Sequence, residues 1–185
     1  VIVPIAMQKQ EVKEKVEKLS KLLGEKYRIE CDTRESYTPG YKFNEWEMKG
    51  VPVRIEIGPR DIEKGECIFV RRDTFEKITV KLEEIETKLG EVLENIQENM
   101  YNECKKNMEK RTSIAENLNE FVEKINTNQG FIETMWCGKQ ECEDKIKELT
   151  GAHSRCMPFN QKQIGNKCVC CGAPAKIFMI WGRQY

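Results

Sequence analysis

Cysteines with the spacing of metal ligands gather in the last third of the chain. Cys137 and Cys142 form a C-x4-C pair, and Cys168 and Cys171 form a C-x2-C pair that Gly172 follows. Two such pairs can supply four thiolates to a tetrahedral zinc ion, each about 2.3 Å from the metal. A glycine after the last cysteine lets the turn direct backbone N–H groups toward sulfur, which eases the negative charge of four thiolates. The pattern predicts a closed, structural zinc site.

The last cysteine turn leaves the fourth ligand open. Cys170 stands beside Cys171, so the sequence also allows a C-x-C pairing through Cys168 and Cys170. We favour Cys171, because C-x2-C followed by glycine is the better-attested metal-binding turn. The competing interpretation is that all of these are buried thiols, which are common in protein cores.

The other cysteines are predicted to be core residues, because they fall in strand-like or helical stripes: Cys31, Cys67, Cys104 and Cys156. The total of nine is odd, and six of them follow residue 130. This distribution argues against the disulfide framework of a secreted domain and favours a cytosolic metal site.

The sequence offers no self-contained catalytic machinery. Its single histidine, His153, has no obvious serine or aspartate partner and is predicted to be a surface or core residue. There is no P-loop and no G-x-G-x-x-G. A nucleophile at Cys170 or Cys171 would need a neighbouring base, which the sequence does not show. A redox-sensing role for the cysteines is a weaker alternative, and thiol reactivity would test it.

Composition bounds the class of protein. The chain has 185 residues, is 39% hydrophobic and 34% charged, and carries a formal net charge of zero. It is therefore predicted to be globular, with room for one large or two small domains, and any nucleic-acid site must be a local patch. No apolar run approaches the roughly 20 residues of a membrane span. No signal peptide is predicted at the start of the chain. Because the chain begins with Val, not Met, inside a strand-like run, we expect a piece of a longer protein.

Short strands alternating with helices are predicted for residues 1–80, which favours a three-layer α/β/α unit with a mixed, mostly parallel sheet. The expected strands are 1–5, 27–31, 51–57, 67–71 and 77–80, the expected helices are 8–23 and about 43–49, and 58–61 is an expected turn.

A long helix is predicted to follow, over residues 81–112, because an apolar stripe runs from Leu82 to Met108. We interpret it as a connection between two domains, and a dimerising coiled coil is the alternative. Residues 113–185 are predicted to form a small α+β zinc-type domain. Its expected helices are 113–126 and 139–149, and its expected strands are 130–137 and 176–181.

One stretch is long and specific enough to indicate a family. Residues 39–61 read PGYKFNEWEMKGVPVRIEIGPRD, and they resemble the anticodon-binding domain of prolyl-tRNA synthetases of the archaeal/eukaryotic type. The segment 67–80, the C-x4-C pair, the CVCCG turn followed by APAK, and the final GRQY continue the similarity, which covers essentially the whole chain. Histidyl-, threonyl- and glycyl-tRNA synthetases share such an α/β domain but lack this cysteine module.

The resemblance implies four contacts with tRNA. Proline anticodons carry two guanines, whose N1–H and N2–H donate to a carboxylate and whose O6 and N7 accept from Arg or Lys. Glu47 matches the carboxylate of the family, Arg54 its guanidinium partner and Lys77 a nearby basic contact. Phe43 resembles the aromatic residue that stacks on an unpaired base. The alternative is that Glu47 and Arg54 form an ordinary surface ion pair and that Phe43 is a core residue.

The resemblance also implies partners and cofactors. The intact enzymes join proline to tRNA(Pro) with ATP and Mg²⁺ in a class II catalytic domain, whose motifs this sequence lacks, so the fragment alone is expected to be inactive. Tyr185 matches a terminal tyrosine whose carboxylate reaches toward the enzyme's own catalytic domain. A homodimer in the cytoplasm, with structural Zn²⁺ and no membrane association, is expected. The alternative is a stand-alone zinc-stabilised accessory or scaffold protein with a borrowed α/β domain.

Overall fold

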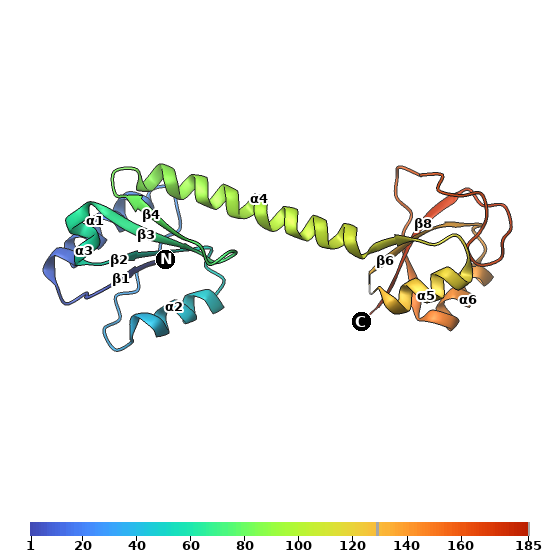
Figure 1. The fold of residues 1–185 in the computed structure, drawn as a ribbon, viewed down its shortest axis with the longest axis horizontal. Coiled ribbons are helices and arrows are strands. Elements are labelled where there is room, and N and C mark those ends of the chain that lie inside the picture. The colour runs from blue at the N-terminus through green and yellow to red at the C-terminus, as the bar shows by residue number, and fades with distance from the viewer. Residues whose placement is uncertain (129, 185) are drawn as a thin grey trace. The chain divides into compact units, whose positions relative to one another are not determined.

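The chain divides into two compact units, Val1–Tyr101 and Asn102–Tyr185. The structure is a computed structural model that describes residues 1–128 and 130–184. Helix α4, Ile85–Arg111, begins in the first unit and ends in the second (Figure 1). No helix in the described part of the chain is both long enough and apolar enough to cross a membrane.

The first unit is built on a four-stranded sheet in the order β1-β2-β3-β4. Strand β1 runs parallel to β2, whereas β2–β3 and β3–β4 are antiparallel pairs. Before α4, its elements are β1 (Ile2–Pro4), α1 (Gln10–Gly24), α2 (Pro39–Met48), β2 (Val53–Ile57), α3 (Pro59–Lys64), β3 (Glu66–Arg71) and β4 (Lys77–Lys81).

The two faces of this sheet differ in chemistry. Val53, Ile55 and Ile57 of β2 lie in one buried cluster with the apolar side chains of α1 and α4. Successive side chains of a strand point to opposite faces, so Arg54 and Glu56 face the other way, toward α2. The predicted α/β class and mixed sheet are confirmed, with a hydrophobic face and a polar face.

Three expectations for the first unit are corrected. The sheet is not mostly parallel, because the short connections through α3 and the β3–β4 hairpin produce antiparallel neighbours. Residues 27–31 form no strand, and only Cys31 makes a bridge, to Ile2. The expected turn at 58–61 instead starts helix α3, where the carboxylate of Asp61 accepts from the N–H of Gly58 at 2.8 Å.

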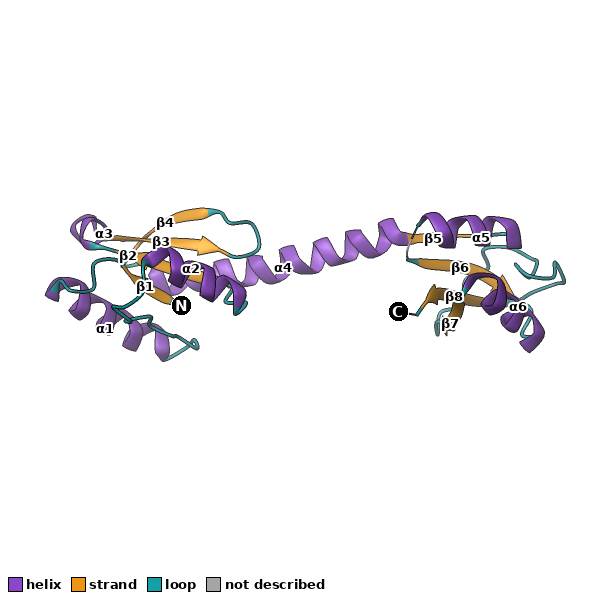
Figure 2. Ribbon diagram, turned by 90° about the horizontal axis from the view of Figure 1, so that it is seen from below, coloured by secondary structure: helices purple, strands orange, loops and turns teal. Residues whose placement is uncertain are grey.

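The second unit has a sheet in the order β5-β6-β8-β7 (Figure 2). Strands β5 and β6 are parallel, and the other pairs are antiparallel. After α4 the elements are β5 (Thr112–Ile114), α5 (Leu118–Thr127), β6 (Phe131–Trp136), α6 (Gln140–Thr150), β7 (Ala152–Cys156) and β8 (Ile177–Arg183). Phe121 of α5, Ile146 of α6 and Trp181 of β8 share one core cluster, so both helices cover the same face.

The second unit also departs from expectation. The predicted helix 113–126 begins only at Leu118, because Thr112–Ile114 pairs with β6 and Asn117 caps the helix. Among the cysteines of both units that were predicted to be core residues, Cys104 and Cys156 are exposed and Cys31 is only half-buried. Cys67 is buried, which confirms the prediction for that residue.

Candidate nucleic-acid interface and metal centre

Phe43, Glu47 and Arg54 lie side by side between α2 and β2. Phe43 and Glu47 are four residues apart on α2, so they share one face of the helix. Arg54 Nη1 donates to Glu47 Oε1 at 2.6 Å, and its guanidinium carbon lies 4.1 Å from the centre of the Phe43 ring. The structure therefore brings three of the four expected tRNA contacts together.

Lys77 joins this cluster through a residue that the sequence analysis missed. Arg54 Nε donates to Glu56 Oε1 at 2.9 Å, and Lys77 Nζ lies 3.8 Å from Glu56 Oε2. The sequence could have indicated Glu56, because residues 54 and 56 of a strand must share a face and Arg54 was already a candidate. Two acidic and two basic side chains then balance one another in charge.

The members of the cluster differ in how far solvent reaches them. The side chain of Glu47 is 32% exposed and that of Lys77 is 62% exposed, whereas that of Arg54 is 9% exposed. Arg72 Nε also donates to the backbone oxygen of Glu47 at 3.0 Å. Arg54 is thus placed to hold Glu47 and to cover one face of Phe43, while Glu47 and Lys77 keep atoms available to a ligand.

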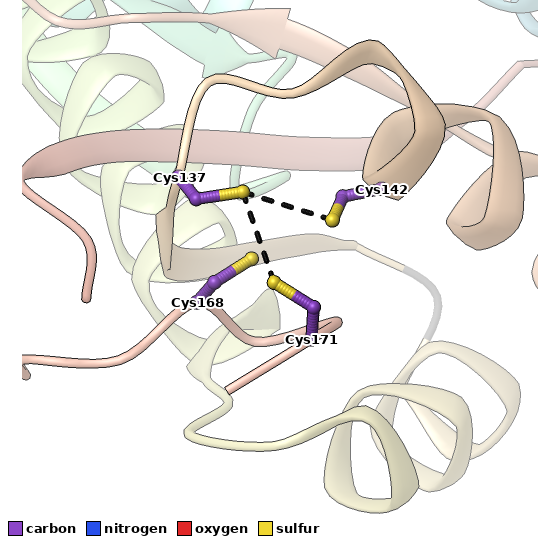
Figure 3. Close-up of side chains that lie close together, drawn as sticks. All are labelled: Cys137, Cys142, Cys168 and Cys171. Carbon is purple, nitrogen blue, oxygen red and sulfur yellow. Dashed lines mark hydrogen bonds between the residues drawn. The ribbon is translucent and has the colours of Figure 1, made fainter. Parts of the chain in front are cut away.

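The second candidate site is a cluster of four sulfur atoms in the second unit (Figure 3). Cys137 follows β6, Cys142 lies in the first turn of α6, and Cys168 and Cys171 flank a turn before β8. All four Sγ atoms lie within 4.8 Å of one another. Cys170, the alternative ligand, packs instead beside the apolar cores of this unit.

The geometry of these sulfur atoms fits a tetrahedral metal ion. Sγ of Cys137 lies 3.7 Å from Sγ of Cys142 and 3.9 Å from Sγ of Cys171. Four thiolates about 2.3 Å from zinc would be about 3.8 Å apart, so little rearrangement is required. Four sulfur ligands also leave no open position for water, which is the arrangement of a structural site.

The turn that carries Cys171 favours its thiolate form. Gly172 has φ +73°, a left-handed conformation that glycine adopts without strain. A hydrogen bond from the N–H of Ala173 lowers the pKa of the Cys171 thiol, whereas burial raises the pKa of Cys142. A bound cation would offset the cost of ionising the buried thiol.

His153 lies half-buried in β7, where its backbone pairs with Gly182 of β8. Tyr185, the expected contact with a catalytic domain, lies outside the described residues.

Comparisons with known proteins match both units. Residues 1–92 match the family model described as "Anticodon binding domain", and residues 118–185 match the one described as "Prolyl-tRNA synthetase, C-terminal". The chain belongs to the prolyl-tRNA synthetase family. The family resemblance inferred from residues 39–61 and from the cysteine turns is thereby confirmed.

Similar relatives share the whole length of the chain. Proteins named "Proline--tRNA ligase" are 49% identical in Clostridium botulinum (strain Langeland), 48% in Clostridium novyi (strain NT) and 46% in Ruminiclostridium cellulolyticum, each over 185 residues. The match covers 100% of this chain and 38% of each of these relatives. The chain thus corresponds to about two fifths of a member of the prolyl-tRNA synthetase family.

Proposed function

We propose that this chain reads the anticodon of tRNA(Pro) as part of a proline–tRNA ligase. In that enzyme, proline is joined to tRNA with ATP and Mg²⁺ by a catalytic domain outside this chain. The observation that carries the proposal is the partly exposed Glu47 carboxylate, which Arg54 holds at 2.6 Å beside Phe43 and near Lys77. The names of the relatives support the substrate.

The cluster has the chemistry to recognise guanine. The carboxylate of Glu47 accepts hydrogen bonds from N1–H and N2–H of one guanine, an edge that adenine cannot imitate. Arg54 fixes that carboxylate and neutralises its charge. Lys77 supplies a mobile cation for O6, N7 or a phosphate, and the edge or free face of Phe43 contacts a base.

We propose that the metal is a structural zinc ion held by Cys137, Cys142, Cys168 and Cys171. Bound there, it would tie the start of α6 to the turn before β8. The spacing of the sulfur atoms and the low thiol pKa of Cys171 support this assignment.

The remaining partners follow from the proposed ligase. We expect the enzyme's own catalytic domain to be a partner of this chain, and we expect the intact enzyme to be a homodimer in the cytoplasm. Nine free cysteines are compatible with a reducing compartment.

Binding of an anticodon stem-loop RNA tests the proposal. Glu47→Ala and Arg54→Ala should each weaken binding of the stem-loop with the two guanines by about 1–3 kcal/mol and relax discrimination at those positions. The matched control is Glu63→Ala, which removes an exposed carboxylate on α3 and should change neither quantity. Equal affinity of the unaltered chain for a stem-loop whose guanines are replaced by adenines would refute anticodon reading.

A further inference from the structure

Helix α2, which carries Phe43 and Glu47, has no fully buried apolar side chain. The structure describes all ten of its residues, and the buried one among them is Lys42. The hydrophobic core of the first unit contains no side chain of α2. Helices on a protein surface normally gain their stability from a buried apolar stripe. Polar contacts therefore carry much of the positioning of α2, beside its half-buried Phe43 and Trp46.

Apart from the contacts that Arg54 and Arg72 make with Glu47, these polar contacts converge on Asp32, in the loop after Cys31. Its carboxylate is fully buried, with 0% exposure. Oδ2 accepts from Trp46 Nε1 of α2 at 2.8 Å and from Arg34 Nη2 at 2.6 Å, and Oδ1 accepts from Arg34 Nε at 2.9 Å. One side chain thereby ties the helix to the loop that follows the bridge to β1.

Two more residues of α2 contact Asp32 or its partner Arg34. Lys42 Nζ donates to the backbone oxygen of Asp32 at 3.1 Å and lies 3.6 Å from Oδ1. Arg34 Nη2 also donates to Glu45 Oε2 at 2.6 Å. Hydrogen bonds from Arg34 hold the pKa of the Asp32 carboxyl well below its usual range, so Asp32 is charged at neutral pH.

We propose that Asp32 is a positioning residue for anticodon recognition, which anchors α2 so that Glu47 remains in register with Arg54 and with a guanine edge. This inference rests on the proposed function. Trp46 and Glu47 are adjacent in the helix, so a displacement of one moves the other directly. Hydrogen bonds weaken steeply with distance and angle, so a small movement of α2 is enough to impair recognition.

The first unit contains a matched control in Asp73. Its carboxylate accepts from Arg71 Nε at 3.0 Å, from Arg71 Nη2 at 2.7 Å and from Asn99 Nδ2 at 2.8 Å. The chemistry repeats that of Asp32, with an arginine two residues away, but the helix that it ties down is α4. Substitution of Asp73 therefore measures the effect of losing a carboxylate with similar hydrogen bonds, while the contacts that hold α2 stay intact.

The test compares two anticodon stem-loops, one with the two guanines and one with adenines in their place. The measured quantity is the dissociation constant of the adenine stem-loop divided by that of the guanine stem-loop, so a larger ratio means stronger discrimination. Asp32→Asn should reduce this ratio about tenfold, whereas Asp73→Asn should leave it unchanged. In the Glu47→Ala background, Asp32→Asn should have no further effect, because both substitutions remove the same interaction. A merely destabilising substitution would not show this dependence on Glu47.

Trp46→Phe keeps the test decisive if Asp32→Asn fails to fold. This change removes one hydrogen bond to Asp32 and leaves every charge in place, and it should reduce the ratio about threefold. The inference is overturned if Trp46→Phe and a folded Asp32→Asn both preserve the ratio, or if their effects persist in the Glu47→Ala background. If Glu47→Ala itself leaves the ratio unchanged, the proposed function and the inference both fail.

Discussion

Arg54 shows how a charged residue can serve recognition while being largely covered. Its guanidinium contacts two carboxylates and an aromatic ring, which together replace the water lost on burial. Breaking a fully buried pair costs about 3–5 kcal/mol, but Glu47 is 32% exposed, so we expect a smaller loss of stability. Binding measurements on Arg54→Ala therefore need a parallel unfolding curve.

The cysteines provide the residue-scale prediction. Cys171→Ser should lower the affinity for zinc by more than about 100-fold, because loss of even an outer hydrogen-bonding partner of a metal site costs about 10- to 100-fold. Competition with a chromophoric chelator measures this affinity. Cys170→Ser is the matched control, since this neighbouring residue packs beside the core and should retain full affinity. The reverse result would assign the fourth ligand to Cys170.

The two sites were predictable from the sequence to different degrees. The spacing of Cys137, Cys142, Cys168 and Cys171 led to a sulfur cluster that the structure also assembles, because short spacings constrain geometry locally. Glu47 and Arg54 came from the resemblance alone. Asp32 escaped notice because its importance arises from contacts with residues 10 and 14 positions away. A single acidic residue in a loop carries no periodic signal.

At the scale of elements, several errors concerned where helices begin. Helix α2 starts at Pro39, where proline fits the first helical position and Thr38 Oγ1 accepts from the N–H of Tyr41. Helix α3 also starts with a proline, Pro59, but there the carboxylate of Asp61 accepts from the N–H of Gly58. Apolar periodicity located the middles of helices well. It misplaced the starts of α2 and α5, because prolines and capping residues determine where these helices begin.

Helix α5 illustrates this point and offers a prediction. Asn117 Oδ1 accepts from the N–H of Glu120 at 3.0 Å, which satisfies a donor that the helix itself cannot. Asn117→Ala should therefore lower the free energy of unfolding of the second unit by about 1 kcal/mol. Chemical denaturation monitored by circular dichroism measures the change. Asn119→Ala, an exposed position inside the same helix, should be neutral or slightly stabilising, and a loss as large as that of Asn117→Ala would contradict the capping role.

At the scale of the whole molecule, the two units have separate cores. The buried cluster of the first unit draws on α1, α4 and β1–β4, and the clusters of the second draw on α5, α6 and its own sheet. Cys142 and Cys168 belong to a small cluster with Met135 and Phe178. The sulfur site is therefore part of the packing of the second unit and has no counterpart among the buried residues of the first.

This separation predicts a local response to metal removal. Chelation should increase hydrogen exchange at the backbone amides of β6 and β8 by at least about tenfold, because four sulfur atoms freed of the ion repel or protonate and the adjoining small core loosens. The amides of β2 and β3 should keep their protection, since their core contains none of these cysteines. Mass spectrometry of peptides from both units, before and after chelation, measures the difference. Unchanged exchange in β6 and β8 after verified loss of metal would show that the second unit folds without the ion, and equal increases in both units would show that the two cores unfold together.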